Sequence, residues 1–168
     1  MYLENAEKKK FFQKITIKKQ FSNIEIGLYQ YFLNKTGFFP KNIIIYNDFI
    51  FFFVENENFF SIYRHLPSIR REIKKKKILI IRDEKSLVKL LFSFFPDIYI
   101  HDIKIEKNKA SNEIQAIICI LSFEERGIAI GKDGKYIKAV NDIFNNYIYL
   151  QNGKVSIKIK CNLVYLDR

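Results

Sequence analysis

Residues 126–138 read Arg-Gly-Ile-Ala-Ile-Gly-Lys-Asp-Gly-Lys-Tyr-Ile-Lys and hold three of the chain's six glycines. Glycines this close together, between two segments with helical spacing of apolar residues, predict a place where the backbone approaches something closely. Gly131 and Gly134 bound the loop, and the helix that follows offers its first N–H groups and positive dipole end to a phosphate. Positive charge on the same side comes from Lys132, Lys135 and Lys138. The segment therefore predicts a binding site for a phosphate backbone.

The loop differs from two other phosphate-binding loops. A nucleotide-binding P-loop needs Gly-x-x-x-x-Gly-Lys-Ser/Thr and a dinucleotide fold needs Gly-x-Gly-x-x-Gly after a strand, and the sequence contains neither pattern here. It has Gly-x-x-Gly between two short helices, the arrangement that clamps the backbone of about four single-stranded nucleotides in KH domains. A single-stranded nucleic acid is therefore the expected ligand.

The elements around the loop follow from capping residues and periodicity. Ser122-Phe-Glu-Glu125 is a capping box that opens a short helix to Ile130. A second helix is predicted over residues 135–145, with Ile137, Val140 and Phe144 on one face. Strands are expected at residues 114–121, 147–150 and 154–160, the last two joined by the turn Asn152-Gly153.

The first half of the chain predicts the same order of elements. A capping box at residues 22–25 opens a helix that ends at Gly37. The apolar face of this helix is expected to hold Ile24, Leu28, Tyr31 and Phe32. After it come strands at 43–45 and 49–54, a helical segment at 61–76 with a break at Pro67, and a strand at 77–82.

From residue 83 the order begins again. A helix is expected at residues 87–94 and a strand at 98–105, followed by a polar loop at 106–113. Phe-Phe-Pro stands between the first helix and the first strand of each half, at 38–40 and at 94–96, where proline cannot continue a helix. An internal repeat is the economical explanation.

Residues 123–144 resemble a KH domain, and the tandem arrangement over about residues 22–160 resembles the paired type II KH domains of NusA transcription factors, closest to the short archaeal form. The expected fold is α+β: two tandem type II KH domains, each a three-stranded sheet packed on helices, the first degenerate. The expected division is a basic N-terminal arm at 1–20, a KH domain without Gly-x-x-Gly at 21–82, and a KH domain with the Gly-Lys-Asp-Gly loop at 83–168.

Two details of this division have alternatives. The arm is expected to be solvated, and a docked strand around residues 12–18 is the alternative. Type I KH topology would need a helix after the last strand, but residues 161–168 are too short and β-prone for one. No role is predicted for this tail.

The first module departs from the KH pattern where function would lie. Aligning Ile62 with Ile130 places Tyr63-Arg-His-Leu66 opposite the glycine loop, so both glycines are missing. Tyr63 and Leu66 would obstruct a ligand backbone, which predicts a module that has lost its clamp and acts as a packing partner. The lysine run at 74–77 could face RNA or be a solvated helix end.

Composition limits the class of protein. The chain has 168 residues, with 29 Lys and Arg against 18 Asp and Glu, a net charge of +11 that favours a polyanionic partner. The alternative is codon bias, because Ile, Lys, Asn, Phe and Tyr are the residues that an AT-rich genome encodes. Two cysteines and two histidines in no ligand spacing argue against a metal site. The expected location is the cytoplasm, or an organelle stroma or matrix, without secretion or membrane insertion.

The function implied by the resemblance is single-stranded RNA binding that modulates transcription elongation, termination or antitermination, without catalysis and with no cofactor or metal. RNA polymerase is a possible partner by resemblance only. Gly131 and Gly134 would admit the RNA backbone, Lys132 and Lys135 would contact phosphates, and bases would lie in an apolar groove with their edges read by strand backbone. The groove residues would be Ile128, Ile130 and Ile137, and Arg126, Asp133 and Lys138 complete the expected site.

Two other classes of protein are alternatives to an RNA-binding transcription factor. A structural RNA-binding component of a ribosomal or other ribonucleoprotein assembly would keep the fold without needing the free glycine loop. A hydrolase or transferase has little support, because His65 and His101 stand in no recognisable catalytic motif.

Overall fold

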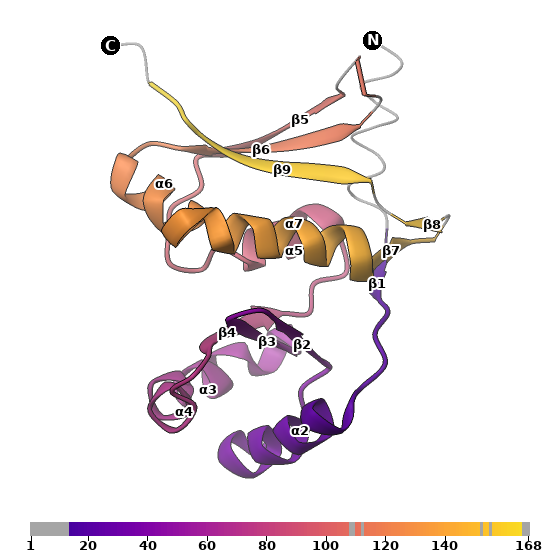
Figure 1. The fold of residues 1–168 in the computed structure, drawn as a ribbon, viewed down its shortest axis with the longest axis vertical. Helices are drawn as coiled ribbons and strands as arrows, with labels where there is room; N and C mark the ends of the chain where they lie inside the picture. The colour runs from indigo at the N-terminus through magenta and orange to yellow at the C-terminus, as the bar shows by residue number, and fades with distance from the viewer. Residues whose placement is uncertain (1–13, 108–109, 112, 152, 155, 166–168) are drawn as a thin grey trace. The chain divides into compact units, whose positions relative to one another are not determined.

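The computed structural model describes residues 14–107, 110–111, 113–151, 153–154 and 156–165, and these divide into two compact units (Figure 1). The N-terminal unit is Ile17–Lys85. The C-terminal unit is Ser86–Arg168 together with the residues before Ile17. The sequence placed boundaries after residues 20 and 82, whereas the contacts place them after residues 16 and 85.

The N-terminal unit is built from three helices and a small sheet in the order helix, strand, strand, helix, helix, strand. Its elements are α2 (Asn23–Thr36), β2 (Asn42–Tyr46), β3 (Phe49–Val54), the short turn η1 (Asn56–Asn58), α3 (Phe59–Tyr63), α4 (Leu66–Glu72) and β4 (Lys77–Arg82). The strands lie in the order β2-β3-β4, with β2 antiparallel and β4 parallel to β3. Because β4 runs parallel to β3, the chain must cross over between them, and α3 and α4 form that crossover.

Helix α2 begins and ends where its sequence predicts, and most of its predicted face meets the core, since Phe32 is buried there and Leu28 and Tyr31 pack against it. Ser22 and Glu25 form the capping box, and Gly37 ends the helix in the left-handed conformation at φ 80°. Ile24, expected on the apolar face, is 71% exposed, whereas Glu25 and Phe32 are buried. The Glu25 carboxylate accepts from the Ser22 N–H at 2.6 Å and pairs with Lys19, which satisfies its buried charge.

The break in the helical segment lies before Pro67 rather than at it. Helix α3 ends at Tyr63 and α4 begins at Leu66, so Pro67 occupies the first turn of α4. A proline is tolerated there because the first N–H groups of a helix have no partner within the helix. Both helices face a core centred on Phe32 and Phe52, whose ring centroids are 4.5 Å apart.

The C-terminal unit repeats the order of elements. It contains α5 (Leu87–Ser93), β5 (Asp102–Lys107), β6 (Ile114–Ile120), α6 (Phe123–Ile130), the turn η2 (Lys132–Gly134), α7 (Lys135–Tyr147) and β9 (Ile157–Leu163). The strand order is β5-β6-β9, with β5 antiparallel and β9 parallel to β6. The same order and the same strand directions in both units confirm the predicted repeat of elements.

Additional strands distinguish the C-terminal unit. The strands are β1 (Ile15–Ile17), β7 (Ile148–Leu150) and β8 (Gly153–Lys154), and they form a sheet in the order β1-β7-β8. The expected pairing of 147–150 with 154–160 is therefore wrong in part, because β7 pairs with the short β8 while β9 pairs with β6. Strand β9 also runs on to Leu163, so Cys161, in the tail that had no predicted role, is buried in the sheet.

The docked-strand alternative holds for residues 15–17, where Ile15 is buried in β1. The rest of the predicted arm, residues 1–13, lies outside the described residues. The described chain is α+β, with small sheets and helices. None of the helices in the described ranges has the length and apolar character needed to cross a membrane.

Candidate nucleic-acid interface

The glycine loop joins α6 to α7 through a tight turn with positive φ angles. Helix α6 ends at Ile130, and Gly131 (φ 78°, ψ 169°), Asp133 (φ 55°) and Gly134 (φ 69°) all have positive φ. The Gly134 N–H donates to the Gly131 carbonyl at 3.1 Å, which closes the turn. Backbone angles of this kind favour glycine strongly, so the local conformation explains both glycines before any ligand is considered.

The two glycines meet different surroundings. A Cβ added to Gly131 would lie 2.7 Å from the Tyr136 Cβ and 3.1 Å from the Tyr136 nitrogen. Tyr136 is buried, donates its hydroxyl to the Phe94 carbonyl, and has its pKa raised by that burial. The close approach predicted at Gly131 is therefore made within the protein, by the first turn of α7.

Gly134, unlike Gly131, has space for a side chain beside its Cα atom. Among the described residues, no heavy atom outside its neighbours lies within 4 Å of the position that its Cβ would take. The same is true of Gly127, which is exposed on α6 one turn before Gly131. Gly127 is a further candidate site residue that was not predicted from the sequence, although its spacing of four from Gly131 brings the two glycines to the same side of α6. A ligand backbone can approach at Gly127 and Gly134.

The cations near the loop lie on the loop itself, on α7 and on α6. Lys132 and Lys135 are exposed at the loop and at the start of α7. Lys138 pairs with Asp142 at 3.3 Å, one turn further along α7. The Arg126 Nε donates to the Cys161 carbonyl at 3.0 Å, which holds the side chain against β9. Lys132 and Lys135 are the exposed cations closest in sequence to the two glycines of the turn, and exposed Asp133 lies between them.

The three predicted groove isoleucines are only partly exposed. Ile128 on α6 is 51% exposed, whereas Ile130 and Ile137 are half-buried at the two ends of the loop. Helix α7 instead turns a more strongly buried face to the sheet, made of Tyr136, Ala139, Val140, Ile143 and Phe144. Ile128 is the most accessible apolar side chain of the predicted set.

The outer edge of β9 is already hydrogen-bonded by side chains of α7 and α6. Asn141 donates to the Ile159 carbonyl at 3.0 Å and accepts from the Ile159 N–H at 2.7 Å. Asn145 makes the same pair of bonds to Ile157, at 2.8 and 3.1 Å. The expected reading of base edges by strand backbone is therefore not available at these two residues, because their edge groups are occupied.

The side chains of Asn141, Asn145 and Arg126 form a ladder of hydrogen bonds along β9, in which the Cys161 carbonyl accepts from Arg126. Burial raises the pKa of the Cys161 thiol to about 12. Cys119 is also buried and free. Neither thiol belongs to a cluster of His, Cys, Asp or Glu that could hold a metal within the described part of the chain.

The corresponding junction in the N-terminal unit is shorter. Arg70 of α4 donates to the Ile78 carbonyl of β4 at 3.0 Å, as Asn141 of α7 donates to Ile159 of β9. Arg70 follows buried Ile62 of α3 by eight positions in the sequence. Asn141 follows buried Ala129 of α6 by twelve. The two helices of the N-terminal unit are joined by two residues, whereas α6 and α7 are joined by four, Gly131–Gly134.

This comparison corrects the alignment made from sequence. Leu66, placed there opposite Gly134, is buried in the core of the N-terminal unit and cannot obstruct a surface. Arg64 and His65 form the whole link between α3 and α4.

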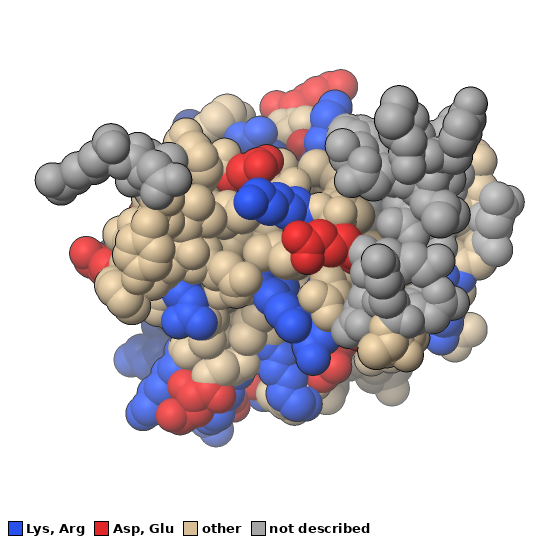
Figure 2. Space-filling model, turned by 90° about the horizontal axis from the view of Figure 1, so that it is seen from above, with Lys and Arg blue, Asp and Glu red and all other residues tan. Residues whose placement is uncertain are grey.

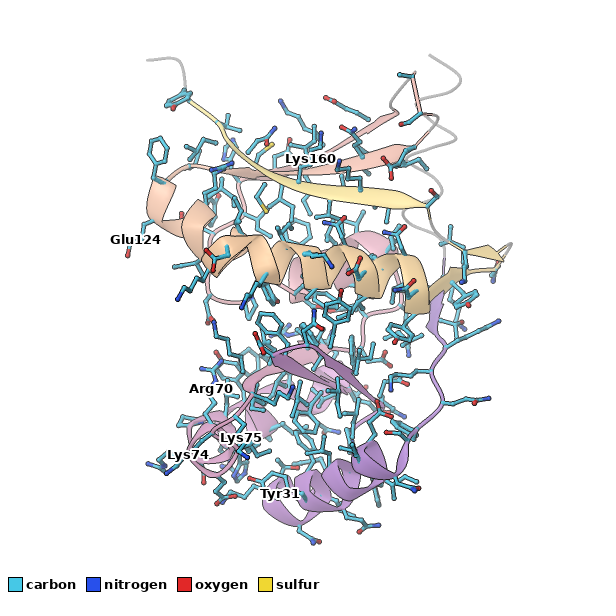
Figure 3. The ribbon with its side chains drawn as sticks, in the orientation of Figure 1. Tyr31, Arg70, Lys74, Lys75, Glu124 and Lys160 are labelled. Carbon is cyan, nitrogen blue, oxygen red and sulfur yellow. The ribbon has the colours of Figure 1, made fainter. Side chains whose placement is uncertain are left out.

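A basic segment lies at the end of α4. Arg70, Lys74 and Lys75 project from this region in Figure 3. Arg70 is hydrogen-bonded to the Ile78 carbonyl and Lys76 to the Asn47 carbonyl, while Arg71, Lys74 and Lys75 are exposed. On the face shown in Figure 2, basic and acidic side chains are interspersed. The net charge of +11 therefore does not form one continuous basic surface on that face.

Comparison with known proteins bears on the fold alone. No protein-family model matches the chain, and no curated protein does. Among solved structures, the chain is similar to the crystal structure of APE1850, with a TM-score of 0.57 and 20% identity. The match covers 84% of this chain and 100% of that chain. The arrangement of elements is thus one that a solved structure also has.

Proposed function

We propose that the chain binds single-stranded RNA through the Gly131–Gly134 loop and acts as a transcription factor of the NusA type. The observation that carries the proposal is the loop itself. Gly134 leaves open space for a backbone, and exposed Lys132 and Lys135 stand on either side of the turn. Two exposed lysines at a turn that leads into a helix N-terminus suit the negative charge of a phosphodiester.

The fold that we propose for both units is the type II KH domain. Each unit has the order helix, strand, strand, helix, helix, strand, and each sheet has one antiparallel and one parallel pair. The C-terminal unit keeps the Gly-x-x-Gly loop that clamps RNA in such domains, and the N-terminal unit lacks it. Binding is therefore assigned to the C-terminal unit.

The cellular role in this proposal is modulation of elongation, termination or antitermination, in the cytoplasm or in an organelle stroma or matrix. RNA polymerase is the proposed protein partner, on resemblance alone. The occupied edge of β9 favours one alternative, a structural component of a ribonucleoprotein assembly that holds RNA through its backbone. A structural component would bind different base sequences about equally, whereas a regulatory factor would discriminate between them.

The test reverses one charge in the loop. Lys132→Asp should weaken binding of a single-stranded oligoribonucleotide about tenfold or more, because it removes one phosphate contact and adds a repulsion. Arg64→Asp, in the link between α3 and α4 of the other unit, is the matched control and should change affinity little. Fluorescence anisotropy measures both, with circular dichroism to verify folding. Unchanged affinity in folded Lys132→Asp protein would contradict the proposal.

A further inference from the structure

The beginning of α6 carries an exposed apolar patch that the glycine loop does not explain. Its side chains are Tyr99, Leu121, Phe123 and Tyr165, which are 61%, 38%, 73% and 78% exposed. We call these four residues the aromatic patch. Large aromatic side chains so exposed are costly to solvate, and a cluster of them marks a surface that contacts a ligand or a partner.

Hydrogen bonds bring these residues to one end of the C-terminal unit. The Tyr99 N–H donates to the Glu125 carboxylate at 2.9 Å, which fixes Tyr99 beside the first turn of α6. Phe123 is the first residue of that helix. The Val164 N–H donates to the Ile120 carbonyl at 2.9 Å, so Tyr165 and Leu121 leave adjacent parallel strands next to the Ser122 cap. Figure 1 shows the start of α6 and the end of β9 at the same end of this unit.

The exposed face of α6 connects the aromatic patch to the glycine loop. Phe123, Gly127 and Ile128 are exposed along it, and Gly131 ends it. Gly127 lies one turn after Phe123 and has no side chain to interrupt the surface. The helix has eight residues, so this face is about 12 Å long. A ligand held at Gly134 can therefore extend towards Phe123 across the exposed face of α6, where Gly127 leaves the backbone uncovered.

We propose that the aromatic patch stacks nucleobases of the strand whose backbone the glycine loop holds, with Phe123 as the first stacking platform; this inference rests on the proposed function. Stacking on aromatic rings tolerates any base, which suits a site where Asn141 and Asn145 already occupy the backbone edge of β9. Glu124 is labelled at the start of α6 in Figure 3, and its negative carboxylate would repel a phosphate at this position. Bases rather than backbone are therefore the groups that contact the patch.

The absence of tryptophan from the chain makes a direct test possible. Phe123→Trp introduces a single indole at the proposed platform, and Phe60→Trp introduces one at a 76% exposed position on α3. Oligouridylate is titrated into each variant while tryptophan emission and the anisotropy of a label on the RNA are recorded together. Emission of the Phe123→Trp protein should be quenched at the RNA concentrations that saturate anisotropy, and emission of the Phe60→Trp protein should not change.

Phe123→Ala supplies the energetic arm of the test. It should weaken RNA binding by about fivefold or more, because one base loses its stacking partner. The stacking inference is overturned if emission at position 123 does not change, RNA binding is intact and Phe123→Ala keeps the affinity of the wild type. That outcome leaves the proposed function standing and makes a protein the better candidate for the patch. If neither variant nor the wild-type chain binds the oligonucleotide, the proposed function fails and this inference fails with it.

Discussion

Gly131 and Gly134 are chemically identical, yet their positions predict different costs of substitution. Gly131 combines positive φ with extended ψ, a region that almost only glycine adopts, and its missing Cβ makes room for Tyr136. Gly134 has left-handed helical angles and open space around it. The first glycine is required by packing and backbone, and the second by backbone alone.

We predict that Gly131→Ala lowers the free energy of unfolding by about 3 kcal/mol, from backbone strain and the clash with Tyr136. Gly134→Ala should cost about 1 kcal/mol, the penalty of the left-handed conformation. Urea unfolding followed by circular dichroism measures both variants against wild type. If the two variants lose the same free energy of unfolding, the close approach of Tyr136 to Gly131 does not add to the cost of a side chain at position 131.

At this scale the glycine and lysine pattern predicts a candidate site, which stays a prediction, but the pattern does not give the structural reason for Gly131. Its contact with Tyr136 depends on the angle between α6 and α7, which residue spacing does not specify. The side chain of Arg126 is a similar case. Its basic charge suggested RNA, and its hydrogen bond to Cys161 could not be foreseen without the pairing of β9 with β6.

Helix α7 is held on strand β9 by side-chain hydrogen bonds. Asn141 and Asn145, one turn apart on α7, hydrogen-bond both edge groups of Ile159 and Ile157. An edge strand with free N–H and C=O groups can pair with another chain, and these side chains block that pairing. The ladder thus fixes the helix on the sheet and closes the strand edge.

Replacing either ladder residue should expose this edge. We predict that Asn141→Ala lowers the free energy of unfolding by about 1 to 2 kcal/mol and speeds hydrogen exchange of the Ile159 amide. Asn146→Ala, at an exposed position of the same helix, is the matched control for helix propensity and should stay within about 0.5 kcal/mol of wild type. If the two variants behave alike, the ladder does not stabilise the unit.

Most elements were predictable because capping residues and periodicity are local signals. Ser22 and Ser122 cap the helices that their sequences predict, and Asn47 turns the chain between β2 and β3. The exposed Ile24 and the pairing of β7 were not predictable. The exposure of Ile24 depends on the tertiary packing around the first turn of α2, and the pairing of β7 depends on β1, a strand distant in sequence.

For the whole molecule, the distribution of charge matters more than its total. The N-terminal unit, without the glycine loop, holds thirteen Lys and Arg against seven Asp and Glu, counted over residues 17–85. Residues 86–168 hold twelve against nine. If the loop alone contacts phosphates, most of the Lys and Arg side chains make no direct contact with RNA and contribute only through long-range attraction.

The salt dependence of binding measures how many phosphates are neutralised. With three or four contacts around the loop, the logarithm of affinity should fall against the logarithm of salt concentration with a slope between about −2 and −3. A markedly steeper slope would mean that the basic segment of α4 also contacts RNA, and a slope near zero would be incompatible with an electrostatic clamp.

The most direct test of the account is to map where RNA contacts the whole chain. Amide chemical-shift changes in the isotopically labelled protein, titrated with a short oligouridylate, report every residue at once. The account predicts the largest changes at Gly127, Gly131–Lys135 and Phe123, with small changes at Arg64 and His65. Largest changes confined to α4, or none anywhere at saturating RNA, would contradict it.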